Sequence, residues 1–366
     1  MTGTGRDMRF ALIGAGVIGR THAACIMELA PSATLALVAD EVPARARELA
    51  AACGAEAATS AAAVFSRDDI DAVAICTPSG RHAELAVAAL DAGKHVIVEK
   101  PVDVTLRAAR LVAAAEARSA GVVTVVSQHR FDPSSQVVHR AIQEGRLGRL
   151  TSGVASVAWW RGQDYYDSGD WRGSWALDGG GALMNQGIHT ADLLVWMLGE
   201  PVEVSARTAC MAHQRIETED IAVAIIRFAG GALGVLHATT AAYPGLTARI
   251  QVHGDRGSAV IDGDRLIYFH AAPGDADSPG HGATASVNQA ADVLPSQAPV
   301  PAAGSDPRAL SDAHLHQYRD FVEAIQLGRP PAVTVDDAIR ALAVVTAVYQ
   351  SARTGESVPV EVQPRQ

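Results

Sequence analysis

Residues 9–19 read RFALIGAGVIG, and this stretch decides the fold. Its apolar first half predicts a strand, and the glycines that follow in the pattern G-x-G-x-x-G predict a tight turn that opens a helix. A second predicted strand, over 34–39, ends in Asp40. A glycine turn between a strand and a helix, with an acidic residue after the next strand, is typical of a parallel α/β sheet that binds a dinucleotide.

Strand and helix patterns alternate from this stretch to residue 127. Further strands are predicted over 71–76, 95–98 and 122–126, and alanine-rich helices over 43–53, 81–92 and 105–119. This alternation is typical of parallel sheets that are covered on both faces. Residues 1–127 are therefore predicted to form a doubly wound parallel sheet, the Rossmann arrangement.

The pattern changes in the second half of the chain. Between residues 151 and 263 it indicates strands in hairpins, several of them joined by turns that contain glycine, with one helix over 182–198. Residues 128–366 are therefore predicted to form a second domain on a largely antiparallel sheet. Residues 271–310, rich in Ala, Pro, Gly, Ser and Asp, are predicted to be a long mobile loop. Two helices close the chain, over 312–327 and 335–353.

Composition narrows the class of protein. The 366 residues carry a formal net charge of −10, which would repel nucleic-acid phosphates and anionic membranes. No apolar run is long enough to span a bilayer, and the first residues lack the pattern of a signal peptide. The cysteines lie far apart, which predicts reduced thiols in a cytoplasmic protein without structural zinc. They are Cys25, Cys53, Cys76 and Cys210.

The glycine turn predicts a phosphate cradle. Gly14 would permit the tight turn, Gly16 would let the backbone approach a pyrophosphate, and Gly19 would allow close packing of helix on strand. The carboxylate of Asp40 can accept hydrogen bonds from ribose hydroxyls but would repel a 2′-phosphate, so NAD is favoured over NADP. A glycine turn without a nucleotide is the alternative. The predicted cradle is Gly14, Gly16, Val17, Ile18, Gly19 and Asp40.

Together with the motif Glu99-Lys100-Pro101, this cradle resembles the Gfo/Idh/MocA oxidoreductase family. The resemblance is strongest over 72–101, AVAICTPSGRHAELAVAALDAGKHVIVEKP, and continues through the glycines 179–181, His189 and the segment DFVEAIQLGRPP. It implies a Rossmann domain and an α/β domain whose open sheet makes subunit contacts, as a homodimer or homotetramer. It also implies NAD(P)-linked hydride transfer on sugars, cyclitols or related polyols.

The resemblance places the family's catalytic lysine on Lys100 and its histidine on His189. The family pattern D-x-x-x-H has Asn185 here in place of its acid, and an amide cannot titrate. In a helix, Asn185, His189 and Asp192 are spaced i, i+4 and i+7 and would share one face. We expect His189 to act as the general base, Asn185 to orient the hydroxyl or the ring, and Asp192 to support or cap. A purely structural histidine is the alternative.

Lys100 is expected to stabilise negative charge on the reacting oxygen, although an ion pair with Glu99 is the simpler alternative. Adjacent strand residues point to opposite faces, which argues against that pair. Three further residues are expected near the cofactor at the carboxyl edge of the sheet: Thr77, Pro78 and His82. Capping of the next helix is the alternative role for His82. Glu99 is counted with the cofactor residues and is expected to support the site, and His22 is expected to pack beneath the cofactor or to be structural.

Aromatic and charged residues gather in the segment WWRGQDYYDSGDWRGSWALDGGG. Aromatic rings stack on sugar C–H faces, and charged side chains bind hydroxyls or a carboxylate. The expected substrate residues are Arg161, Tyr165, Tyr166, Arg172, Asn185 and His189. Some of the aromatic residues would simply pack the sheet. The two arginines leave open a carboxylated sugar or a nucleotide sugar, and residues 129–131 and His316 are expected to border the site. No metal site is expected.

The leading hypothesis is an NAD-dependent dehydrogenase of a sugar, cyclitol or glycoside, resembling inositol 2-dehydrogenases or sugar 3-dehydrogenases. A keto-sugar reductase using NAD(P)H is the second reading. A non-catalytic NAD-binding sensor or regulatory protein is the third, since folds are reused.

Overall fold

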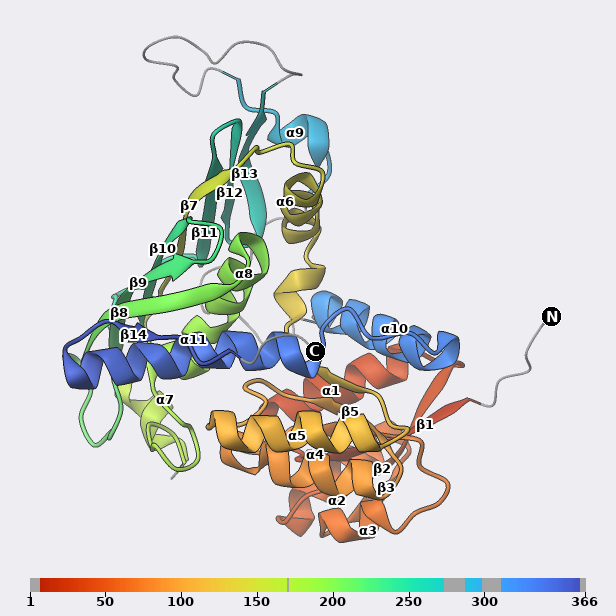
Figure 1. Cartoon of the computed structure of the whole chain (residues 1–366). Helices are drawn as coiled ribbons and strands as arrows, with labels where there is room; N and C mark the ends of the chain where they lie inside the picture. The colour runs from red at the N-terminus through yellow and green to blue at the C-terminus, as the bar shows by residue number, and fades with distance from the viewer. Residues whose placement is uncertain (1–6, 170, 273–286, 298–310, 363–366) are drawn as a thin grey trace, which may run out of the picture. The chain divides into compact units, whose positions relative to one another are not determined.

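The computed structural model describes residues 7–169, 171–272, 287–297 and 311–362 (Figure 1). The chain forms two compact units. The first comprises, of the described residues, 7–128, 176–179 and 311–339. The second comprises the remainder, including the long sheet of the C-terminal half.

The first unit is built on a six-stranded parallel sheet in the order β3-β2-β1-β4-β5-β6. Its strands are β1 (Met8–Ile13), β2 (Ala33–Ala39), β3 (Glu56–Ala58), β4 (Ala72–Ile75), β5 (His95–Val98) and β6 (Val123–Val125). The connecting helices are α1 (Val17–Glu28), α2 (Pro43–Cys53), α3 (Ala61–Phe65), α4 (His82–Asp91) and α5 (Leu106–Arg118). The predicted doubly wound parallel sheet is confirmed.

Helix α10 (Ser311–Leu327) also belongs to the first unit, although its sequence lies in the range expected for the second domain. It packs against α1, and the core of this unit includes the fully buried rings of Phe10, Tyr318 and Phe321. The Phe10 and Tyr318 rings meet edge to face, with centroids 5.9 Å apart. The apolar face of α10 thus completes a core that begins some 300 residues earlier.

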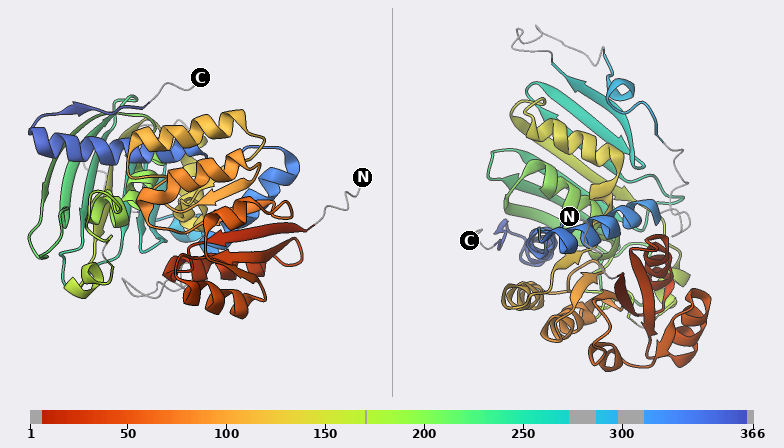
Figure 2. Two further views of the ribbon diagram at one scale, coloured as in Figure 1. Left: turned by 90° about the horizontal axis from the view of Figure 1, so that it is seen from below. Right: turned by 90° about the vertical axis from the view of Figure 1, so that its right-hand side faces the viewer.

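The second unit is built on an eight-stranded sheet in the order β13-β12-β11-β7-β10-β9-β8-β14 (Figure 2). All neighbouring pairs are antiparallel except β7 with β10, so the prediction of a largely antiparallel sheet is confirmed. The strands are β7 (Leu150–Ala158), β8 (Pro201–Ala209), β9 (Ile221–Phe228), β10 (Leu233–Thr239), β11 (Arg249–Gly254), β12 (Gly257–Asp262), β13 (Arg265–Ala271) and β14 (Val358–Pro359).

Helices of the second unit cover one face of this sheet. Helix α8 packs on β7, β10 and β11, and α6 packs on β12 and β13. The helices are α6 (Pro133–Gln143), α7 (Gln163–Asp167), α8 (Ile188–Leu198), α9 (Ala290–Val293) and most of α11 (Val335–Thr354).

Two sequence predictions in this unit need correction. The helix expected over 182–198 begins with one π-helical turn, Leu183–Gly187, before α8 continues it. Residues 287–297 of the expected loop are instead attached to the sheet. Asn288 and Gln297 accept backbone N–H bonds from β13, and α9 begins at residue 290. The rest of that expected loop, 273–286 and 298–310, lies outside the described residues. Within the described residues, no helix combines the length and the apolarity that crossing a bilayer requires.

Candidate active site

The glycine turn after β1 is required by packing at two of its positions. Gly14 has φ +101°, and a Cβ there would lie 2.4 Å from the Cys76 carbonyl oxygen. A Cβ at Gly19 would lie 2.0 Å from the carbonyl oxygen of Gly14. A Cβ at Gly16 would meet no atom within 4 Å, so the space beside this residue is open to a ligand.

Asp40 joins this turn to the end of β2. One carboxylate oxygen accepts the N–H of Ala15 and the other accepts the N–H of Val42, each at 2.8 Å. Both bonds hold a negative charge beside the turn. At the carboxyl end of β4, the buried hydroxyl of Thr77 has no partner among the described residues. An open glycine backbone, a fixed carboxylate and an unpartnered hydroxyl together fit NAD.

His82 connects two loops at the carboxyl edge of the sheet. Its Nδ1 lies 2.7 Å from the Pro101 carbonyl oxygen, and its Nε2 lies 2.8 Å from the Thr77 carbonyl oxygen. The expectation that it caps α4 is wrong, because Arg81 holds the N-cap position and Asp103 accepts the Ala83 N–H. His82 therefore fixes the backbone that follows Thr77 and Lys100.

Glu99 points into a buried network beneath the sheet edge. Its Oε1 lies 2.9 Å from His22 Nε2, and His22 Nδ1 lies 2.7 Å from the Tyr318 hydroxyl. Burial would raise the pKa of Glu99, but hydrogen bonds from His22 and His314 hold that pKa well below its ordinary value. Burial lowers the pKa of His22, so a neutral ring donates to Glu99 and accepts from Tyr318.

Glu99 also accepts the backbone N–H of Lys100, at 3.0 Å. The carboxylate that follows β5 thus fixes the position of the lysine main chain. His314 lies in the same network, with its Nε2 3.9 Å from Glu99 Oε1, whereas His316 is exposed.

In the second unit, Asn185 and His189 stand out on the segment that carries them. Every residue from 178 to 195 is buried except these two, which are half-buried. The π turn and the first turn of α8 therefore present both polar side chains at the edge of an otherwise apolar core. Asp192, expected to support His189, is buried in a two-pronged ion pair with Arg130 at 2.6 and 2.8 Å.

The start of this segment is anchored by Glu219, which sequence reasoning missed. Its buried carboxylate accepts N–H bonds from Gly181 and Leu183, at 2.9 and 2.8 Å, and the Tyr349 hydroxyl at 3.1 Å. A Cβ at Gly181 would lie 1.7 Å from the Glu219 carbonyl oxygen, so the glycine run permits this approach. Burial raises the pKa of Glu219 to about 7.

His129 lies beside His189, with ring centroids 5.4 Å apart in an edge-to-face contact. Its Nδ1 is 2.7 Å from Asp132 and 3.3 Å from Asp264, which lies in the β12–β13 turn with φ +62°. Burial would lower the pKa of His129, but these carboxylates hold it well above its ordinary value. A protonated imidazole therefore adjoins the candidate base. That residues 129–131 border the site stays a prediction, and the sequence did not predict the charge on His129.

Two of the expected substrate residues have different surroundings. Tyr165 is half-buried, and its hydroxyl accepts bonds from Arg172 Nη1 at 2.6 Å and from Gln186 Nε2 at 2.9 Å. Tyr166 is buried, with its hydroxyl 2.7 Å from Thr240 Oγ1, and burial raises its pKa. This geometry favours the packing role that the sequence left open for some aromatic residues.

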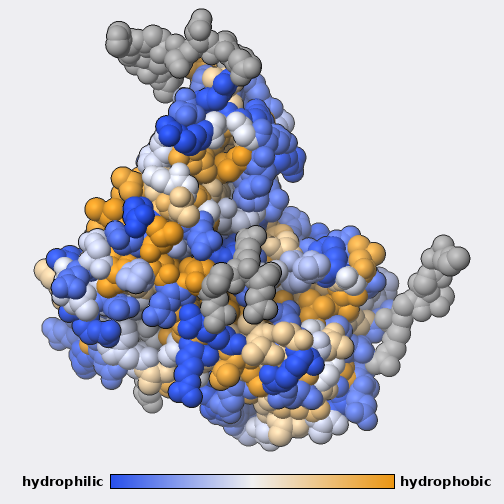
Figure 3. Space-filling model, viewed as in Figure 1, coloured by the Kyte–Doolittle hydropathy of each residue, from blue (hydrophilic) through white to orange (hydrophobic). Residues whose placement is uncertain are grey.

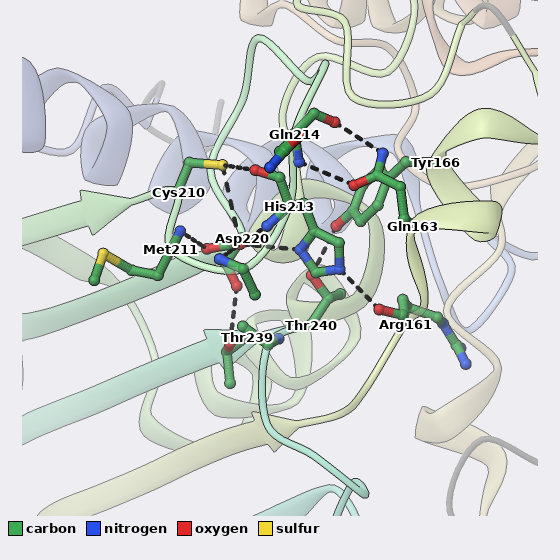
Figure 4. Close-up of polar contacts among 12 residues, drawn as sticks. Arg161, Gln163, Tyr166, Cys210, Met211, His213, Gln214, Asp220, Thr239 and Thr240 are labelled. Atoms are coloured by element: carbon green, nitrogen blue, oxygen red, sulfur yellow. Dashed lines mark hydrogen bonds and ion pairs between the residues drawn. The ribbon is translucent and has the colours of Figure 1, made fainter.

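Arg161 is held through its main chain by the buried pair His213–Asp220 (Figure 4). His213 Nδ1 lies 2.9 Å from Asp220, and its Nε2 lies 2.7 Å from the Arg161 carbonyl oxygen. Asp220 also accepts N–H bonds from residues 211–213. Hydrogen bonds in the second unit also link Arg172 through Tyr165 and Gln186 to the π turn. Lys100 and the glycine cradle belong to the first unit.

We expect Asp40→Ser to shift cofactor preference toward NADP. Removing the carboxylate removes its repulsion of a 2′-phosphate, and the NADPH-to-NADH affinity ratio should rise about 10- to 100-fold. Fluorescence titration with both reduced cofactors measures it. Glu41→Gln, which removes a neighbouring carboxylate that is 85% exposed, is the matched control and should leave the ratio unchanged. An unchanged ratio in Asp40→Ser would remove Asp40 from cofactor selection.

We expect Glu219 to make stability fall as pH rises from about 4.5 to 7. Its folded pKa lies above its ordinary value of 4.5, so folding favours the protonated form, and that contribution is complete below 4.5 and lost through 7. The difference corresponds to about 3 kcal/mol in the free energy of unfolding. Denaturant unfolding of the wild type and Glu219→Gln between pH 4 and 8 measures it. Parallel pH curves for both proteins would contradict the assignment.

Comparison with known protein families matches both halves of the chain. A model described as an oxidoreductase family with an NAD-binding Rossmann fold matches residues 8–127. A model described as the GFO/IDH/MocA C-terminal domain matches residues 135–260. The cradle residues thus lie in an NAD-binding domain, and NAD is the cofactor.

Individual proteins resemble the chain over almost its whole length. Inositol 2-dehydrogenase of Rhizobium meliloti is 30% identical over 356 residues, which cover 94% of this chain and 96% of the relative. Levoglucosan dehydrogenase of Pseudarthrobacter phenanthrenivorans is 28% identical, with 95% and 96% covered.

Among solved structures, the WlbA dehydrogenase of Bordetella pertussis in complex with NADH and UDP-GlcNAcA is similar at a TM-score of 0.85. It is 30% identical, with 98% of this chain and 99% of that chain covered. With both domains matched, and with relatives aligned over nearly their full length, the chain belongs to the Gfo/Idh/MocA family of NAD-binding oxidoreductases.

Proposed function

We propose that the protein oxidises a secondary alcohol of a sugar, cyclitol or glycoside with NAD, and that Lys100 and His189 act at the reacting hydroxyl. The observation that carries the proposal is the exposure pattern around His189. Only this histidine and Asn185 are not buried between residues 178 and 195. The relatives named above are dehydrogenases of polyols and anhydrosugars, which supports the substrate class.

NAD, when bound, supplies the hydride acceptor. Oxidation of the alcohol then leaves one proton, from the hydroxyl, for the protein to take. His189 is the acceptor in our proposal, because an imidazole can take up a proton near neutral pH. The His129 ring lies beside it, with the two ring centroids 5.4 Å apart.

Asn185 orients the hydroxyl in this proposal, and Lys100 stabilises the negative charge that develops on its oxygen. The main chain of Lys100 is fixed by Glu99 on one side and by His82 through Pro101 on the other. The cradle Gly14, Gly16, Val17, Ile18, Gly19 and Asp40 holds the cofactor together with Thr77 and Pro78. Reduction of a keto sugar by NADH is the same chemistry in reverse.

The division of labour between domains belongs to the same proposal. Residues 1–127 bind the cofactor and residues 128–366 bind the substrate and form subunit contacts. A cytoplasmic location agrees with four cysteines that form no disulfide in the structure.

We expect Lys100→Met and His189→Asn each to lower kcat about 10²- to 10⁴-fold with NADH affinity nearly unchanged. The assay follows NADH absorbance across a panel of inositols, aldoses and glycosides. His270→Asn, on a histidine of β13 whose ring contacts the Val287 carbonyl oxygen, is the matched control and should keep full activity. Wild-type kcat in either site variant would exclude that residue from the chemistry. NADH binding without turnover of any compound by the wild type would favour a sensor.

We also propose that the open face of the large sheet forms a dimer or tetramer contact. Alternate residues of β9 and β10 expose apolar side chains, with Val223 46%, Ile225 57%, Leu233 52% and Val235 40% exposed. The space-filling view shows hydrophobic residues at the surface in the region of these strands (Figure 3). Contiguous exposed apolar side chains of this kind mark interaction surfaces.

We expect Ile225→Glu to reduce the assembly to monomers, because a charge would be buried in an apolar contact. Analytical ultracentrifugation measures the mass. Leu111→Glu, on α5 of the first unit and 56% exposed, should keep the wild-type mass. A wild-type protein that sediments as a monomer at micromolar concentration would contradict the proposed contact.

A further inference from the structure

Two arginines flank one aromatic ring in the second unit. The guanidinium carbon of Arg161 lies 5.4 Å from the Tyr165 ring centroid, and that of Arg172 lies 4.2 Å from the same centroid. Arg161 also lies over Trp159, and Arg172 over Trp171. The rings attract each cation, but they carry no net charge that could neutralise either one.

Neither guanidinium has a carboxylate within 4 Å among the described residues. Arg172 donates to Ser168 and Tyr165, both of which are neutral. Neighbouring arginines do have acidic partners: Arg130 pairs with Asp192 and Arg215 with Asp167. Two uncompensated positive charges on half-buried side chains are costly unless an anion joins them.

Buried polar atoms around this pair also lack partners within the part of the chain that the structure describes. They are Arg161 Nε, Trp159 Nε1 and Gln186 Oε1. The Gln186 residue is only 5% exposed, and its amide nitrogen donates to the Tyr165 hydroxyl. The unpartnered donors match an anionic oxygen, and the unpartnered acceptor matches a hydroxyl.

The main chain at Arg161 is held by the second unit itself. The Arg161 carbonyl is held by His213, whose ring is held by the buried Asp220. Figure 4 shows the Arg161 side chain extending away from that network rather than into it. Gln186 lies next to Asn185 in the π turn, so hydrogen bonds through Tyr165 join Arg172 to the segment that carries His189.

We infer that the substrate carries an anionic group, a carboxylate or a phosphate, which binds to Arg161 and Arg172 beside Tyr165. This inference rests on the proposed function, since it names the class of sugar that the site takes. Arginine forms paired hydrogen bonds with both groups. An anionic group on the sugar would supply the missing counter-charge and the acceptor for Arg161 Nε, and a sugar hydroxyl would supply the donor for Gln186.

The test compares sugars that differ only at one carbon. Isothermal titration of the NADH-loaded, full-length protein uses D-glucose, D-glucuronate and D-glucose 6-phosphate, and then the galactose series. We expect at least one anion to bind about tenfold or more tightly than its neutral parent. The member of each series that gains affinity distinguishes carboxylate from phosphate. The preference should weaken as ionic strength rises.

Variants then test whether the two arginines cause the preference for anionic sugars. Arg161→Gln and Arg172→Gln should each abolish it while NADH affinity is kept, and Arg172→Lys should keep part of it, because lysine retains the charge but not the paired donors. Arg149→Gln, whose side chain is 79% exposed, is the matched control and should keep the full preference. If Arg172→Gln fails to fold, Arg172→Lys and Arg161→Gln still show whether the preference depends on the arginines.

The outcomes separate the inference from the proposed function. Equal affinity for neutral and anionic sugars in the wild type, or a preference that survives both glutamine variants, overturns the inference. Turnover of neutral sugars would then still support the proposed function. A preference for anions without NAD reduction by any sugar would support the anion site and contradict the dehydrogenase.

Discussion

A carboxylate buried beneath a helix start holds the second unit's part of the candidate site. The first N–H groups of any helix lack partners within the helix, and those of Gly181 and Leu183 bond to Glu219 instead. Burying this group is costly, as its raised pKa of about 7 shows. These bonds position the segment that follows. It presents Asn185 and His189 at the edge of the core and places Gln186 within hydrogen-bond distance of Tyr165.

The same principle operates in the first unit. Glu99 is buried with His22 and Tyr318, and one of its carboxylate oxygens accepts the backbone N–H of Lys100. In both units the acidic groups orient a neighbour of the proposed chemistry and take no part in it. The Glu219 network also depends on Gly181, where a Cβ would lie 1.7 Å from the Glu219 carbonyl oxygen. A volume change beneath either site would therefore move a reacting side chain without touching a ligand.

The local parts of this fold could be predicted from sequence, and the distant pairings could not. The glycine turn and the apolar strands have fixed periodicity, so residues 9–127 were predictable as a parallel sheet. The return of α10 to that core was not, because the rings of Phe10 and Tyr318 meet across some 300 residues. Glu219, Asp132 and Asp264 were missed for the same reason: an isolated acid in a sequence has no pattern that names its partner. Tyr166 shows the converse, since an aromatic cluster does not reveal which ring turns inward.

The electrostatic effect of this protein on an anionic sugar has opposite signs at long and at short range. A formal net charge of −10 repels an anionic sugar at a distance, but salt screens that repulsion beyond roughly 8–10 Å. Within that distance the guanidinium carbons of Arg161 and Arg172 lie 5.4 and 4.2 Å from the Tyr165 ring centroid, without a carboxylate partner among the described residues. At short range, the two arginines therefore attract the anionic group of a substrate, although the net charge of the protein repels that group at long range. In our proposals, discrimination between neutral and anionic sugars depends on Arg161 and Arg172, whereas the oxidation depends on Lys100 and His189.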